Sequence, residues 1–176
     1  MKTLLLLRHG KSSWDDRDLP DHERPLAPRG IKAAGKVGRW LRRESLTPGL
    51  VLCSTARRTC ETLEWLCEQL PGGRQIPVER ERGLYLCGAR VLLERLRDLP
   101  EEADRVLLLA HNPDLHDLAL VLTEGQAASS NPGALATLNR KYPTAACAWL
   151  ELPIADWRSL TVGSARLLDF FLPRKG

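Results

Sequence analysis

The sequence predicts an α/β fold of three layers, in which helices cover both faces of a mostly parallel sheet that has antiparallel strands at one edge. Short apolar runs alternate with longer amphipathic segments, which is typical of parallel strands joined by crossover helices. The composition, 43% hydrophobic and 27% charged over 176 residues, is close to the average for a globular domain. We therefore expect a single domain over residues 1–176.

The first half of the chain is expected to form two strand–helix units. In order, we predict a strand at 2–7, a polar loop at 10–25, a helix from 28 to about 44, a strand at 50–53 and a helix from about 54 to 70. The strands are uninterrupted apolar runs, whereas the helices carry apolar residues at intervals of three and four. Pro28, with its fixed φ, suits a first helical position, and Ser54-Thr55 is a good helix opening.

The second half continues the alternation and then changes character. We predict a short strand at 76–79, a helix after Gly88, a strand at 105–110 and a helix from 113 to 122. Residues 123–141 contain glycine, serine, asparagine and proline, so we expect a loop-like or irregular stretch. Strands at 145–152 and 165–172 follow, and Pro153 suits a position near the sheet edge. Antiparallel strands are common at such an edge.

Charge and cysteine usage argue against several classes of protein. The net charge is +4, from 26 basic and 22 acidic residues that are spread along the chain, so nucleic-acid binding is not indicated. The leucine run at the start is too short for a secretion signal, and no stretch approaches the length of a membrane span. The number of cysteines, five, is odd, and their spacing does not match that of metal ligands, so neither a disulfide framework nor a zinc site is indicated. We expect a cytoplasmic protein without a metal or cofactor.

Chemically active side chains follow three of the expected strands. Arg8 and His9 follow the first, Arg58 lies just beyond the second, and His111 follows the run at 106–110. Parallel strands place their carboxyl ends at one edge of the sheet, where open α/β sheets bind ligands. An imidazole can attack phosphorus, and guanidinium groups hold phosphoryl oxygens with fixed, permanently charged donors. Together these four side chains predict a phosphate pocket.

Six segments spread along the chain form a recognisable series. They are Leu6–Trp14, Asp21–Leu26 with Arg29-Gly30, Ser54–Thr59 with Glu61-Thr62, Leu84–Leu86, Ala110–Pro113 and Tyr142–Ala146. In this order they resemble the histidine phosphatase superfamily, and specifically its short branch of SixA-type phosphohistidine phosphatases. The series covers nearly the whole chain, which makes the resemblance far more specific than any single motif. It implies a phosphoglycerate mutase-like fold.

The resemblance implies a role for each residue of the pocket. His9 would attack phosphorus in line and form a phosphohistidine intermediate that water then hydrolyses. A hydrogen bond from its other ring nitrogen to a backbone carbonyl would fix the useful tautomer. Arg8 and Arg58 would hold the equatorial oxygens, because phosphoryl transfer depends mainly on positioning and electrostatics. His111, in its protonated form, would donate a further hydrogen bond to the phosphoryl group.

Two further residues are expected to bind substrate. Arg24 matches the Arg-Pro-Leu motif of the family and is expected at the mouth of the pocket. Asn112 is expected beside His111, where it binds substrate or shapes the turn. Ala110 stands where the family usually has glycine, a change that removes no catalytic group.

No general acid is identified by the sequence. The connection at 80–87, between the third strand and the next helix, is too short for the inserted segment that carries a glutamate in larger members of the superfamily. The acidic residues that could supply a proton are Glu79, Glu81, Asp15 and Asp21. A phosphoramidate leaving group is basic and can be protonated without a dedicated acid, so this absence favours phosphohistidine over a phosphate ester.

Three functions are compatible with these residues. The first is hydrolysis of phosphohistidine on a phosphorylated partner protein. The second uses the same residues on a small phosphate ester, as a phosphatase or a mutase. The third is a noncatalytic module that binds phosphate or a phosphoprotein, and the presence of His9 argues against it because a binding module needs no nucleophile.

Overall fold

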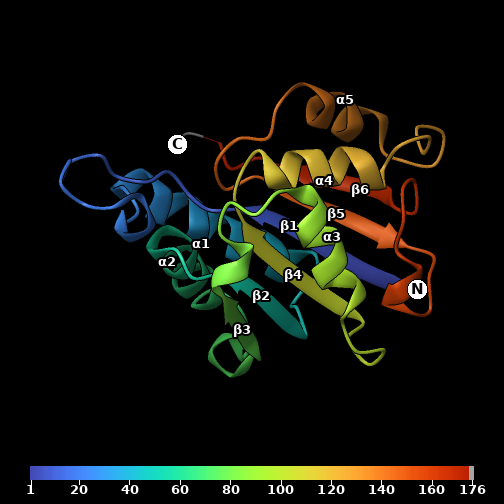
Figure 1. Cartoon of the computed structure of the whole chain (residues 1–176), viewed down its shortest axis with the longest axis horizontal. Helices are drawn as coiled ribbons and strands as arrows, with labels where there is room; N and C mark the ends of the chain where they lie inside the picture. Colours follow the sequence, from blue (N-terminus) through green and yellow to red (C-terminus); the bar gives the residue numbers. More distant parts are fainter. Residues whose placement is uncertain (175–176) are drawn as a thin grey trace.

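The computed structural model describes residues 1–174, and a mixed sheet forms its centre (Figure 1). Its strands are β1 (Lys2–Arg8), β2 (Leu50–Ser54), β3 (Val78–Glu81), β4 (Arg105–Ala110), β5 (Cys147–Leu152) and β6 (Arg166–Phe171). They are arranged in the order β3-β2-β4-β1-β5-β6. The pairs among β1 to β4 are parallel, whereas β5 is antiparallel to both β1 and β6. The predicted mostly parallel sheet is confirmed, with β6 at the edge and β5 next to it.

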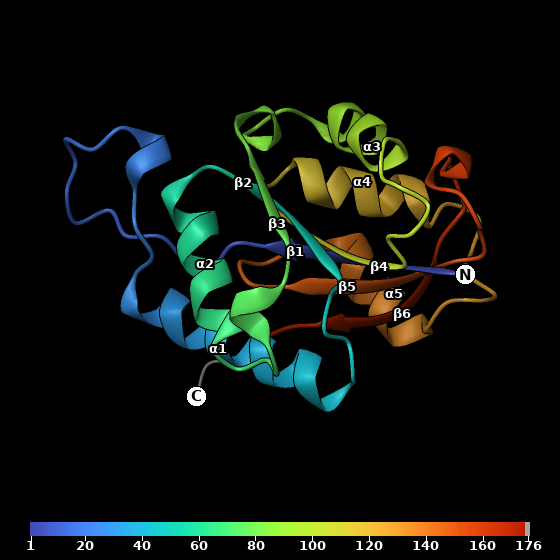
Figure 2. The same cartoon turned by 90° about the horizontal axis from the view of Figure 1, so that it is seen from below.

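Helices cover both faces of this sheet. They are α1 (Pro28–Arg43), α2 (Arg57–Cys67), α3 (Ala89–Arg97), α4 (Asp114–Leu122) and α5 (Pro132–Arg140). Figure 2 shows α3 and α4 on one side of the strands and α1 on the other. The predicted three-layer α/β/α architecture is therefore confirmed. No helix in residues 1–174 is both long enough and apolar enough to cross a membrane.

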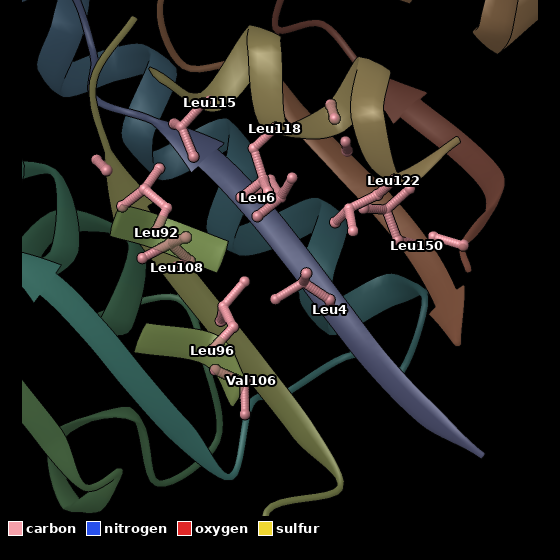
Figure 3. Packing of buried hydrophobic residues seen from close by; sticks show 14 of the residues in the cluster. Leu4, Leu6, Leu92, Leu96, Val106, Leu108, Leu115, Leu118, Leu122 and Leu150 are labelled. Atoms are coloured by element: carbon pink, nitrogen blue, oxygen red, sulfur yellow. The ribbon is translucent and has the colours of Figure 1, made fainter. Parts of the chain in front are cut away.

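Alternation along β1 divides the core into two layers. Leu4 and Leu6 point into the cluster formed with α3 and α4 (Figure 3), whereas Leu5 and Leu7 point into the cluster under α1 and α2. All four side chains are fully buried. A strand covered on both faces reads as a continuous apolar run, because successive side chains point to opposite faces. Each buried leucine contributes about 1.5–3 kcal/mol, so β1 is held firmly beneath the residues that follow it.

The prediction for residues 123–141 was wrong, because this stretch contains helix α5. The side chain of Asn131 accepts a hydrogen bond from the backbone N–H of Ala134 at 3.1 Å, and Pro132 occupies the first helical position. Leu138 of this helix is fully buried. Asparagine followed by proline acts here as a cap and first helical residue, whereas the prediction treated the pair as a helix breaker.

The loop after β1 packs directly on the first turn of α1. A Cβ atom on Gly10 would lie 2.7 Å from the carbonyl oxygen of Gly30, and one on Gly30 would lie 2.2 Å from that of Lys11. Only glycine allows two backbones to approach this closely. Beyond this contact the loop extends away from the sheet (Figures 1 and 2) before it returns to α1. The packing fixes the backbone immediately beyond His9.

Candidate active site

The structure brings all six predicted site residues to one pocket at the carboxyl ends of β1, β2 and β4. The pocket has a volume of about 300 Å³, and its lining includes Arg8, His9, Arg24, Arg58, His111 and Asn112. The rings of His9 and His111 lie 5.2 Å apart between centroids. The topology explains this convergence, because β1 pairs with β4 in parallel and β4 pairs with β2.

His9 has the geometry of a neutral nucleophile. Its Nδ1 lies 2.7 Å from the carbonyl oxygen of Gly10, so Nδ1 carries the proton and donates it to that oxygen. The unprotonated Nε2 faces the pocket, where the Nε–H of Arg58 donates to it at 3.3 Å. Burial is the main cause that lowers the pKa of His9 to about 3, and Arg58, Arg8 and Arg24 lower it further, against the raising effect of the Gly10 carbonyl. His9 is therefore neutral near pH 7.

His111 differs from the sequence prediction in its protonation state. Its Nε2 lies 2.8 Å from Oγ of Ser54, and its Nδ1 lies 3.4 Å from Nη2 of Arg58. Since the guanidinium can only donate, the geometry fits a neutral ring with its proton on Nε2. Burial, followed by His9 and Arg58, lowers the pKa of His111 to about 3. His111 is therefore neutral near pH 7, whereas the sequence predicted a protonated ring.

Arg58 is positioned by contacts on both sides of the pocket. Its Nη1 donates to the backbone oxygen of Asp21 at 2.7 Å, and its Nη2 donates to the Asp21 carboxylate at 3.0 Å. Behind it, Thr62 donates to the carbonyl of Arg58 at 2.7 Å and accepts from the N–H of Gly10 at 3.0 Å. The neighbouring Arg57 is exposed and lies 3.6 Å from Glu61. The first turn of α2 thus directs Arg58, and not Arg57, into the pocket.

Asp21 connects the two arginines at the mouth of the pocket. Arg24 is buried and donates from Nη1 to the Asp21 carboxylate at 3.0 Å, and Trp14 covers its guanidinium with the ring centroid 3.1 Å away. The hydroxyl of Tyr85 also donates to this carboxylate. Burial acts to raise the pKa of Asp21, but hydrogen bonds from Tyr85, Arg24 and Arg58 outweigh it and lower that pKa to about 2. Asp21 is therefore a carboxylate near neutral pH.

The carbonyl of Tyr142 holds Arg8 and Asn112 side by side. Arg8 donates to it from Nη1 and Asn112 donates to it from Nδ2, each at 2.9 Å. Nε of Arg8 and Oδ1 of Asn112 are buried and have no hydrogen-bond partner among the described residues. Burial, and then the charge of Arg58, lowers the pKa of Arg8. An anion between the two arginines would relieve their repulsion and bind the unpartnered Nε.

The structure separates the four acidic candidates. Glu79 and Glu81 both form ion pairs with Arg95 of α3, and neither lines the pocket. Asp15 is exposed in the loop after β1 and is also absent from the lining. Asp21 alone contacts the site, and its low pKa keeps it deprotonated near pH 7. Asp21 therefore pairs with Arg58 and Arg24 and does not hold a proton that it could donate to a leaving group.

Four residues that contact the site had no functional role in the sequence analysis. Ser54, expected only as a helix opening, ends β2 and binds His111, while the helix itself begins at Arg57. Thr62 links α2 to the loop beyond His9. Tyr85 packs edge-on against His111, with centroids 5.3 Å apart, and Tyr142 supplies a backbone oxygen. All four lie in the segments that carry the family resemblance, and that resemblance was the signal that could have identified them.

Comparisons with known proteins agree with this fold. Residues 4–85 match the model of the histidine phosphatase superfamily, branch 1. An uncharacterised protein of Mycobacterium leprae is 34% identical over 172 residues, which cover 96% of this chain and 100% of that protein. A solved structure from Nakamurella multipartitia, provisionally named phosphohistidine phosphatase SixA, is 30% identical with a TM-score of 0.81, over 98% of this chain and 96% of that one.

A further structure, the protein histidine phosphatase SixA complexed with tungstate, shows the same fold. Its TM-score is 0.74 at 24% identity, over 97% of each chain. The family match and the SixA-type neighbour support a phosphatase, an enzyme of the hydrolase class. The chain belongs to the histidine phosphatase superfamily and, within it, to the SixA-type branch.

Proposed function

We propose that the protein hydrolyses phosphohistidine on a partner protein, through a covalent intermediate on His9. The observation that carries this proposal is the orientation of the His9 ring. Its Nδ1 is held by the Gly10 carbonyl at 2.7 Å, and the unprotonated Nε2 faces a pocket that contains Arg8 and Arg58. A neutral imidazole beside permanently charged donors suits nucleophilic attack on a phosphoryl group.

In the first step, Nε2 of His9 forms a bond to phosphorus while the bond from phosphorus to the leaving nitrogen breaks. Arg8 and Arg58 hold the equatorial oxygens, and the contact between Arg58 and Nε2 gives way to contacts with the phosphoryl group. The negative charge of that group favours protonation of His111, whose Nδ1 then donates to it. The role predicted for His111 therefore belongs to the substrate complex.

In the second step, water forms a bond to phosphorus and the bond to Nε2 breaks. The water proton passes to solvent or to a phosphate oxygen, and the products are inorganic phosphate and neutral His9. During both steps the Gly10 carbonyl keeps the proton on Nδ1. This hydrogen bond also stabilises the positive charge that the ring carries while Nε2 is phosphorylated.

Two features of the site support phosphohistidine as the substrate. Asp21, the acidic residue that contacts the site, has a pKa of about 2 and is a poor proton donor near neutral pH. The leaving nitrogen of a phosphoramidate is basic enough to take its proton from solvent. In addition, a short turn at Arg82–Leu84 joins β3 to the segment before α3. This connection leaves the pocket accessible to a phosphohistidine carried by a protein.

The proposal is tested by comparing kcat/KM for a phosphohistidine protein, free phosphohistidine and a panel of phosphate esters. These ratios measure how well the site binds each transition state. We expect both phosphohistidine substrates to exceed every ester. A tenfold or greater preference for an ester would overturn the proposal and support a small-molecule phosphatase or mutase. Binding of the phosphoprotein without turnover would support a noncatalytic module.

A further inference from the structure

A second groove adjoins the catalytic pocket and is lined by cations. Its volume is about 450 Å³, and it shares Lys11 and Thr144 with the lining of the catalytic pocket. Its charged lining residues are all basic: Lys11, Arg29, Lys32, Lys36 and Arg174. No carboxylate lines it among the described residues. We call it the basic groove.

Helix α1 forms one wall of the basic groove and carries a stripe of charge. Arg29, Lys32 and Lys36 are spaced by three and four positions, so they lie on one face of the helix. At a rise of 1.5 Å per residue the stripe extends for about 10 Å. Arg29 lies in the first helical turn, where the helix dipole favours acidic residues, and α1 has none there. Helix stability therefore does not account for this placement.

The basic groove contains little internal compensation for its charge. None of its five cations forms an ion pair with a residue in the part of the chain that the structure describes. Lys36 donates a hydrogen bond to the backbone carbonyl of Arg174, which orders its side chain without neutralising it. Arg29 and Lys32 are exposed to solvent. Neighbouring like charges of this kind are stabilised by an anionic partner.

We infer that the basic groove docks an acidic surface of the phosphohistidine protein beside the histidine that is dephosphorylated. This inference rests on the proposed function, since it places that protein against the catalytic pocket. The shared residues Lys11 and Thr144 make the groove continuous with the site, so one partner reaches both. The charges are spread along a helix over about 10 Å, which matches an extended acidic surface better than a single phosphate.

Docking through this groove has a kinetic signature. Complementary charge accelerates the association of two proteins, and this acceleration becomes smaller as salt screens the charges. The double variant Lys32→Gln/Lys36→Gln is expected to lower kcat/KM for an acidic phosphohistidine protein about tenfold at low salt and to leave kcat unchanged. The difference from wild type shrinks at high salt. Free phosphohistidine, which cannot reach the groove, should be cleaved within twofold of the wild-type rate.

The matched control is the double variant Arg42→Gln/Arg43→Gln. It removes the same charge from the other end of α1, where both side chains are exposed and neither lines the groove. It is expected to behave like wild type. Equal losses in the two double variants would assign the effect to net charge and overturn the inference. Equal losses on the protein and on free phosphohistidine would assign it to the catalytic pocket, with the same consequence.

A failure of the proposed function looks different from a failure of this inference. The wild type would then cleave neither phosphohistidine substrate, or it would prefer an ester at least tenfold. In that case the groove is tested by binding of the same acidic protein in its unphosphorylated form. Weaker binding to Lys32→Gln/Lys36→Gln than to Arg42→Gln/Arg43→Gln supports the docking surface. If Lys32→Gln/Lys36→Gln weakens binding of inorganic tripolyphosphate and leaves binding of the acidic protein unchanged, the groove belongs to small polyanions and protein docking is refuted.

Discussion

Replacing Arg58 with lysine isolates the contribution of its planar guanidinium. In the structure this group donates to the Asp21 backbone and carboxylate at 2.7 and 3.0 Å and to Nε2 of His9 at 3.3 Å. A lysine keeps the charge but provides one compact ammonium, which cannot reproduce this forked arrangement. The substitution therefore preserves the positive charge and removes the planar arrangement of donors.

The expected loss can be stated from these contacts. Removing one preorganised donor to a developing oxyanion costs about 3–4 kcal/mol in the transition state, or about 100- to 1000-fold in rate. We expect Arg58→Lys to lower kcat/KM for a small phosphoramidate by this factor, mainly through kcat. The assay is release of inorganic phosphate under steady-state conditions, together with a thermal melt to show that the variant is folded.

Arg57→Lys is the matched control for this prediction. Arg57 precedes Arg58 in the chain but is exposed and pairs with Glu61, so its substitution should change kcat/KM by less than twofold. The reasoning is refuted if Arg58→Lys keeps activity within threefold of wild type. It is also refuted if both variants lose activity equally, because the effect would then belong to the helix and not to the pocket.

Three further outcomes are expected. The pKa of His111 is about 3 in the folded state and about 6.5 when unfolded, so the unfolded state binds the extra proton and stability falls as pH decreases from about 6.5 towards 3. Urea denaturation should show a smaller loss between pH 7 and pH 5 in His111→Gln than in wild type, and equal losses would contradict the buried neutral ring. Gly30→Ala forces a Cβ to 2.2 Å from the Lys11 carbonyl and should cost about 1–3 kcal/mol with lost activity, whereas Gly35→Ala, whose Cβ meets only a flexible side chain at 3.4 Å, should be neutral or stabilising. Thermal melts and phosphatase assays of the two variants test this prediction, and equal changes in stability and activity for both would exclude the close backbone contact at Gly30. Activity should persist in a chelator, because among residues 1–174 the pocket is lined by four cations and no carboxylate; loss that added metal restores would refute metal-independent chemistry.

The catalytic edge of the sheet was predictable because its residues lie close in sequence to obvious strands. Arg8, His9 and His111 each end or follow a fully buried apolar run. The parallel pairing of β1 with β4 then brings the carboxyl ends of these two runs together. Arg58 required the order of family segments, because Arg57 beside it has the same chemistry. The structure separates the two through Asp21, which lies in a loop far away in the chain.

The parts that were not predictable depend on distances set by the whole fold. The neutral state of His111 follows from its burial and from the closeness of His9 and Arg58, none of which has a local signal. The role of Asp21 depends on how the long loop after β1 folds back. Helix α5 was missed for a local reason, because Asn131 with the proline after it served as an N-terminal cap.

The most direct test of the central claim is to locate the phosphate during turnover. The wild-type enzyme is mixed with a phosphoramidate and quenched in alkaline denaturant, which preserves phosphohistidine, and its peptides are analysed by mass spectrometry and ³¹P NMR. We predict phosphate on Nε2 of His9, and neither label nor turnover in His9→Ala. Phosphate on another residue, or full turnover by His9→Ala, would contradict the account.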